Sequence, residues 1–198
     1  MYSKSIQKLI DLFSKFPTVG PRTASRFVFY LIQKPTEEIN EIINAISDLK
    51  KDVKICPSCF KPFDATSELC EICSNPSRNK NLLCLVEKEI DLETIEKTKK
   101  YQGLYFILGG TLPKLKKEGA EKLRIKELEE KIKNSPEIQE IIIALNPTPE
   151  GESTTLYLER MIRPLNKKTS RLGRGLPIGA ELEYADDETL SSAFENRR

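Results

Sequence analysis

The stretch that organises this chain is CPSCFKPFDATSELCEIC, residues 56–73. It contains two Cys-x-x-Cys pairs, Cys56/Cys59 and Cys70/Cys73, with ten residues between them. Each pair can turn two thiolates toward one ion, and together the pairs supply the four soft ligands of a tetrahedral Zn²⁺ site. Two disulfides or four free thiols are the alternatives. Because four thiolates leave no position for water, we expect a structural Zn²⁺ without a catalytic role.

The composition of the 198 residues limits the classes of protein to consider. This length allows one domain, or two small domains with a metal-bound insert. The chain has no histidine, which excludes histidine acid–base chemistry and histidine metal ligands. No segment approaches the roughly 18 apolar residues of a membrane span, and residues 1–16 lack the apolar core of a signal peptide. We therefore expect a cytoplasmic protein that does not associate with membranes.

The first 34 residues form a basic helical module, although the net charge of the whole chain is only +2. Apolar residues at helical spacing predict one helix over 4–16 and a second that begins at Pro21, where the missing N–H is tolerated. A third helix should begin at Thr36, which we expect to act as its cap. The module has a single acid, Asp11, against six cations: Lys4, Lys8, Lys15, Arg22, Arg26 and Lys34.

The turn FPTVGP, residues 16–21, joins the first two predicted helices and suggests a nucleic-acid contact. Backbone N–H groups after Gly20, at the positive end of the second helix, can bind a phosphate. Arg22 and Arg26 lie one turn apart on that helix and can add two positive charges. This is how a helix-hairpin-helix holds DNA without contacting its bases. An ordinary helical hairpin with surface arginines explains the same residues.

From residue 81 onward, strand and helix patterns alternate. Apolar runs predict strands over 82–87, 104–108 and 141–145, and helices over 92–100, 121–133 and 154–162. Cys84 falls within the first apolar run and should be a buried small hydrophobe. Continuous apolar strands that alternate with helices predict an α/β fold, with a mostly parallel sheet covered by helices on both faces.

Four acids should gather at the carboxyl edge of this sheet. Glu87 closes the first predicted strand and Asp91 follows it, whereas Glu150 and Glu152 follow the strand over 141–145. Oxygen ligands of this kind suit Mg²⁺ in phosphoryl transfer. Alternatively, the acids form a surface that binds a basic partner or simply stays solvated.

The order of these parts resembles the RecR family of bacterial recombination mediators, almost end to end. The residues that carry the resemblance are 16–24, the four cysteines, 84–87, 105–110, 144–152 and 175–184. The resemblance implies a helix-hairpin-helix DNA-binding module over 1–53, a four-cysteine zinc motif over 54–78, a Toprim domain over 79–174 and a Walker-B-like C-terminal segment over 175–198.

The resemblance also implies a function and a set of partners. It implies a DNA-repair mediator of the RecF/RecO pathway, a clamp-like homodimer or homotetramer, cytoplasmic and nucleoid-associated. Its partners would be RecO, in many bacteria RecF, and single-stranded, gapped or duplex DNA bound without sequence preference. With them it would help RecA replace single-strand binding protein. By position, the four cysteines are zinc ligands, Gly20, Arg22 and Arg26 contact DNA, and Glu87, Asp91, Glu150 and Glu152 contact RecO.

Several residues depart from related patterns. Catalytic Toprim enzymes carry an Asp-x-Asp pair where this chain has Asn146 and Thr148, so two magnesium ligands are missing and we expect no enzymatic activity and no catalytic residue. Thr18 replaces the first glycine of the hairpin, and the lysine-rich residues 113–120 are a further candidate DNA contact. A Toprim enzyme that nicks or primes DNA with Mg²⁺, and a zinc-bearing interaction module without a DNA role, are the alternative functions.

Overall fold

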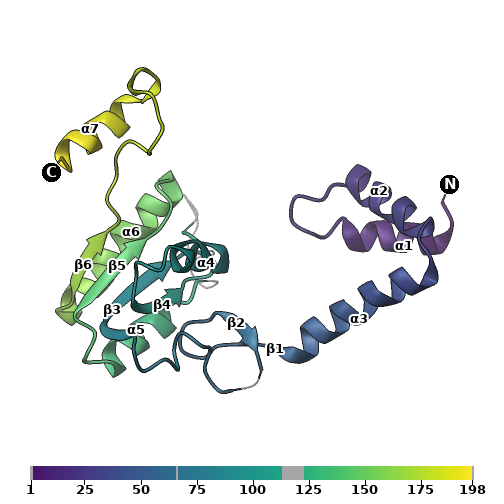
Figure 1. The fold of residues 1–198 in the computed structure, drawn as a ribbon, viewed down its shortest axis with the longest axis horizontal. Helices are drawn as coiled ribbons and strands as arrows, with labels where there is room; N and C mark the ends of the chain where they lie inside the picture. The colour runs from purple at the N-terminus through teal and green to yellow at the C-terminus, as the bar shows by residue number, and fades with distance from the viewer. Residues whose placement is uncertain (1, 66, 113–122, 198) are drawn as a thin grey trace. The chain divides into compact units, whose positions relative to one another are not determined.

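The computed structural model describes residues 2–65, 67–112 and 123–197, and the chain divides into two compact units, Met1–Val53 and Lys54–Arg198. The first unit contains α1 (Lys4–Phe13), α2 (Pro21–Ile32) and α3 (Thr36–Asp52). Figure 1 shows these helices and the strands and helices of the second unit.

The first unit has a small core between α1 and α2. Its buried side chains are Ile10, Ala24 and Val28, whereas α3 has no buried residue. The prediction for α1 was too long, because the helix ends at Phe13 and a turn occupies residues 14–18. The predicted cap of α3 was wrong: Thr36 is its first helical residue, Pro35 occupies the cap position, and no side chain caps it.

The second unit is built on a parallel sheet with the strand order β4-β3-β5-β6. The strands are β3 (Asn79–Val86), β4 (Gly103–Ile107), β5 (Glu140–Ala144) and β6 (Lys168–Arg171). Leu85 lies beside Phe106 on one side and Ile143 on the other. The predicted mostly parallel sheet is therefore confirmed, and its central strands are the continuous apolar runs.

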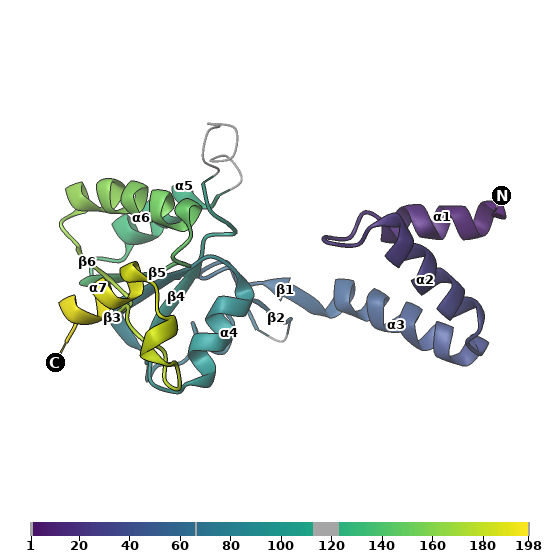
Figure 2. The same ribbon diagram turned by 90° about the horizontal axis from the view of Figure 1, so that it is seen from above.

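Helices cover both faces of this sheet. α5 (Ile125–Asn134) and α6 (Pro149–Ile162) pack on the face that carries Leu83, Leu85 and Phe106. α4 (Glu89–Lys97) packs through Leu92 on the opposite face, together with three of the four cysteines. Figure 2 shows α5 and α6 on one side of the strands and α4 on the other.

Helix starts and several elements differ from the sequence prediction. α4 begins three residues before the predicted 92, because the N–H of Lys88 donates to the Asp91 carboxylate at 3.0 Å. α6 begins at Pro149, because the Thr148 hydroxyl accepts a hydrogen bond from Gly151 N–H at 3.1 Å. Six elements were not predicted from the sequence: β1 (Val53–Ile55), β2 (Pro62–Asp64), β6, the 3₁₀ turns η2 (Arg163–Leu165) and η3 (Leu182–Tyr184), and α7 (Asp187–Glu195).

No helix among the described residues is long and apolar enough to cross a bilayer.

Candidate functional site

The two cysteine pairs come together in the second unit. Cys56 and Cys59 lie in the turn between β1 and β2, where Cys56 N–H donates to Lys61 O at 2.9 Å. The four sulfur atoms, from Cys56, Cys59, Cys70 and Cys73, all lie within 4.8 Å of one another. A tetrahedral ion with metal–sulfur bonds of about 2.3 Å needs sulfur atoms roughly 3.8 Å apart. The cluster therefore fits one metal ion.

Disulfides do not explain the cluster. All five cysteines are free thiols, and the Sγ atoms of Cys59 and Cys70 are 3.5 Å apart, well beyond a disulfide bond. Their mutual hydrogen bond raises the pKa of Cys59, to which burial adds, and lowers the pKa of Cys70. A bound cation would take the place of the shared protons, so metal uptake should release protons.

The cysteine segment, residues 56–73, is part of the second unit's core. Cys56, Cys59, Cys70 and Ile72 are packed in the same apolar cluster as Leu92 of α4 and residues of β3 and β4. Polar contacts on its surface connect the cysteine segment to the neighbouring helices. The Lys61 ammonium pairs with Glu71 and with Glu93 of α4, the latter at 3.1 Å. The Lys131 ammonium on α5 donates to the Ser58 hydroxyl at 2.7 Å. Loss of the metal should therefore affect the sheet as well as the cysteine loops.

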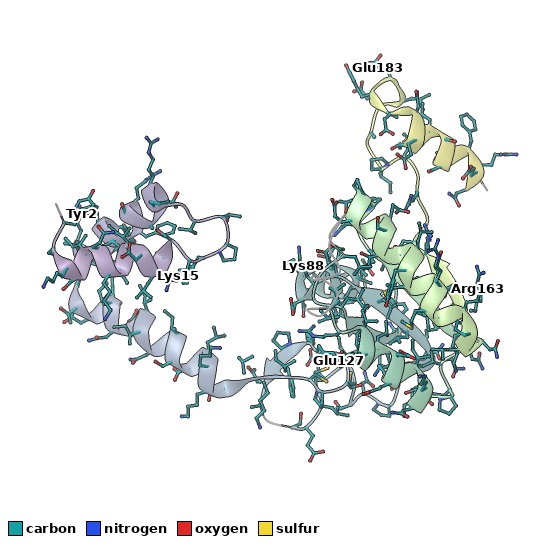
Figure 3. All side chains as sticks on the ribbon, turned by 180° about the vertical axis from the view of Figure 1, so that it is seen from behind. Tyr2, Lys15, Lys88, Glu127, Arg163 and Glu183 are labelled. Carbon is teal, nitrogen blue, oxygen red and sulfur yellow. The ribbon has the colours of Figure 1, made fainter. Side chains whose placement is uncertain are left out.

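The carboxyl edge of the sheet, which we call the rim, carries Glu87, Asp91, Glu150 and Glu152 as predicted. Glu87 directly follows β3, and only 9% of its surface is exposed. Its carboxylate accepts a hydrogen bond from the Asn146 amide at 3.3 Å and pairs with the Lys88 ammonium at 2.9 Å. In Figure 3, Lys88 marks the rim, whereas Arg163 lies at the opposite end of α6. The amide at Asn146 thus binds Glu87 where the Asp-x-Asp pattern would place a second carboxylate.

The carboxylates of the rim do not surround a common position for a metal ion, and one of them is paired with arginines instead. Glu152 pairs with Arg171 at 3.1 Å and with Arg174, and Arg171 also binds Glu159 at 2.9 Å. Within the described part of the chain, the four cysteines are the only group of three or more His, Cys, Asp or Glu residues that could hold a metal ion. The described rim acids therefore form no cluster of three or more carboxylates around one ion position, which the magnesium interpretation would need.

Arg171 and Arg174 were not predicted as site residues. No sequence signal identified them, because Arg171 ends the polar strand β6 and Arg174 follows it in a loop. Both line a cavity of about 610 Å³ between α4, the end of β5, residues 171–175 and α7. The rim is therefore acidic with two arginines at its border.

The helical hairpin lies in the first unit. Gly20 precedes α2, and no described side chain caps this helix. Arg22 and Arg26 are exposed and form no ion pair with any described residue. Thr18 adopts the left-handed backbone with φ 63°, which is unusual for a β-branched residue. The hairpin thus keeps a left-handed backbone at residue 18, although this position holds threonine in place of glycine. Residues 113–120, the further candidate DNA contact, lie outside the described residues.

Known proteins similar to this chain identify the family to which the described geometry belongs. Family descriptions match three parts of the chain: "RecR, helix-hairpin-helix" at residues 6–50, "Toprim domain" at 81–173 and "RecR, C-terminal" at 175–198. A protein named recombination protein RecR from Bifidobacterium animalis subsp. lactis is 43% identical over 197 residues, which covers 100% of this chain and 97% of the relative.

The chain belongs to the RecR family.

Two further relatives carry the same name. RecR of Cutibacterium acnes is 40% identical over 100% of this chain and 96% of its own length. RecR of Clostridium perfringens is 39% identical over 99% of this chain and 97% of its own length. Membership of the RecR family assigns the chain to DNA recombination and repair. The expectation that the chain is no enzyme agrees with a name that describes recombination and no catalysed reaction.

Proposed function

We propose that this protein is a recombination mediator that binds DNA without sequence preference through Gly20, Arg22 and Arg26. The single observation that carries the proposal is the start of α2, where two exposed arginines flank a helix end without a side-chain cap. Backbone N–H groups at such an end favour a phosphate, and the arginines add charge without contacting bases. In this proposal, Cys56, Cys59, Cys70 and Cys73 bind a structural Zn²⁺, the metal that four thiolates select most often in closed tetrahedral sites.

The variant Arg22→Ala/Arg26→Ala is expected to weaken DNA binding about tenfold or more at moderate salt for every sequence tested. Two lost phosphate contacts should reduce the slope of log K against log[salt] by about 1.4 to 1.8. Fluorescence anisotropy with a labelled gapped duplex and a labelled single strand over a salt series measures both effects. The matched control is Lys50→Ala/Lys51→Ala, which removes the same charge from the end of α3. If the two double variants had equal slopes of log K against log[salt], the hairpin arginines would not be part of the DNA-binding site.

We further propose that the rim binds RecO, and that the complex, in some bacteria with RecF, helps RecA displace single-strand binding protein. The proposal is supported by the position of Glu87, Asp91, Glu150 and Glu152 at the ends of β3 and β5. Carboxylates at one edge of a sheet attract a basic surface and speed its association.

Glu150→Lys is expected to lower the affinity for RecO about tenfold at low salt, because it reverses a charge at the rim. The effect should shrink as salt increases. Surface plasmon resonance with RecO from the same organism measures it. Glu137→Lys is the matched control, since Glu137 precedes β5 and lies at the opposite edge of the sheet. The same loss of affinity in both variants would mean that the rim is not the RecO site.

We also propose that the protein forms a homodimer or homotetramer that closes around DNA. The proposal is supported by two sets of exposed apolar side chains. α3 presents Ile42, Ile43, Ile46 and Leu49, and the C-terminal segment presents Ile178, Leu182, Tyr184 and Phe194. Large exposed apolar patches usually mark interfaces.

Multi-angle light scattering is expected to give a mass of two or four times 22.6 kDa. Ile46→Asp in α3 and, separately, Tyr184→Asp in the C-terminal segment should each halve that mass if the species is a tetramer held by two interfaces. Addition of a gapped duplex should shift the unmodified protein toward the larger species. A monomer at micromolar concentration with and without DNA would contradict the clamp.

A further inference from the structure

The loop that contains Cys59 and Phe60 contacts the outer edge of the sheet, at strand β4. β4 is an edge strand, with β3 on one side only. On its other side, Ile107 N–H donates a hydrogen bond to the carbonyl oxygen of Cys59 at 3.0 Å. The Arg124 guanidinium donates to the Ile107 carbonyl at 2.9 Å. Both backbone polar groups of Ile107 are thus bound by atoms outside the sheet, and one of those atoms belongs to a metal-ligating residue.

Phe60, the residue after Cys59, packs between the edge strand and this arginine. Its ring meets Phe106 of β4 edge-on, with ring centroids 5.2 Å apart, and the Arg124 guanidinium lies 4.5 Å from the ring centroid. The Phe60 backbone is left-handed, with φ 67°, and its N–H donates to Cys56 O at 2.9 Å. A left-handed backbone conformation is unfavourable for a residue other than glycine. Its surroundings must therefore maintain this conformation, and the two cysteines that precede it in the turn, Cys56 and Cys59, are candidate metal ligands.

The same part of β4 reaches the rim on its other side. Leu108 N–H donates to Val86 O at 2.9 Å, and Gly109 N–H donates to Glu87 O at 2.9 Å. The three residues 107–109 are therefore held between Cys59 and Glu87. Only the end of β4 separates the Cys59–Phe60 backbone from Glu87, so a change in that backbone can reach the rim through residues 107–109.

We propose that metal occupancy of the four-cysteine site controls the end of β4, and that Phe60 is the positioning residue that transmits it. With the metal bound, the Cys59 carbonyl and the Phe60 ring fix residues 107–109 and, with them, the backbone of Glu87. Without the metal, the left-handed turn at Phe60 relaxes and the outer edge of β4 opens. An edge strand without its cover exposes unpaired N–H and C=O groups to water and to other chains.

Amide hydrogen exchange of the full-length, Zn²⁺-loaded protein tests this coupling. At saturating Zn²⁺, Phe60→Ala should still hold one ion per chain, since Phe60 is not a ligand. It should raise the exchange rates of the Ile107 and Gly109 amides about tenfold, which is the protection that one backbone hydrogen bond typically supplies. The amides of β5 should stay within about twofold. Phe60→Tyr keeps the ring and should behave like the unmodified protein.

Two further measurements use the metal itself. Removal of Zn²⁺ with a chelator should accelerate exchange at Ile107 and Gly109 before β5. Because coupling is reciprocal, Phe60→Ala should also weaken Zn²⁺ binding severalfold in competition with a chelating dye, whereas Phe60→Tyr should not. The proposal is overturned if Zn²⁺-loaded Phe60→Ala exchanges like the unmodified protein at both amides. It is also overturned if β5 accelerates as much as β4, because that result means general destabilisation.

Discussion

Cys59→Ser is expected to lose the bound metal and to lower the free energy of unfolding of the second unit by at least about 3 kcal/mol. Structural zinc contributes on the order of 10 kcal/mol to folding in small modules, and three thiolates bind it much more weakly than four. The effect extends beyond the cysteine loops, because three of the four ligands are buried in the core shared with α4 and the sheet. Metal content by mass spectrometry and thermal unfolding by circular dichroism measure the two effects.

Cys84→Ala is the matched control for this experiment. Cys84 is also buried, but it lies in β3 outside the metal cluster, and burial raises the pKa of its thiol to about 12. A thiol with such a pKa stays protonated and does not replace a lost ligand. Cys84→Ala should therefore keep one metal ion per chain and cost only about 1 kcal/mol. If Cys59→Ser bound a full equivalent of metal and melted at the normal temperature, the cluster would not be a structural metal site.

Gly151→Ala is expected to destabilise the second unit by about 3 kcal/mol and to lower its melting temperature by roughly 10 °C. A Cβ atom at Gly151 would lie 1.9 Å from the backbone oxygen of Asn146, closer than any real contact. The loop between β5 and α6 would have to move, and the Asn146 amide would move away from Glu87. The variant should therefore also lower the affinity for RecO. A substitution that only destabilises the core would not have this second effect.

Gly173→Ala provides the comparison for that variant. Nothing lies within 4 Å of a Cβ atom at Gly173, so this substitution should change stability by less than about 0.5 kcal/mol. Differential scanning calorimetry of the two variants, with equal changes in composition, gives the difference directly. Similar melting temperatures for both would show that the loop at Asn146 adapts without cost.

Sequence patterns are sufficient to predict the main parts of this protein. The apolar runs at 82–87, 104–108 and 141–145 are continuous because their strands are covered on both faces, so the pattern alone predicted a parallel sheet. The Cys-x-x-Cys pairs were equally informative, because only a short spacing lets two thiolates face one ion. Cap residues set the helix starts less clearly: Thr148 and Asp91 fix α6 and α4 through hydrogen bonds that spacing does not reveal.

The contacts between these parts depend on how the chain folds and are not visible in the sequence. Asn146 and Glu87 are 59 positions apart, and their hydrogen bond exists because β3 and β5 are neighbours in the sheet. Arg171 reaches Glu152 from β6, a polar edge strand with no hydrophobic pattern to predict it. Cys59 covers the edge of β4 through its backbone carbonyl. A carbonyl is present in every residue, so no sequence pattern can mark it, and its partner is fixed only when the chain folds.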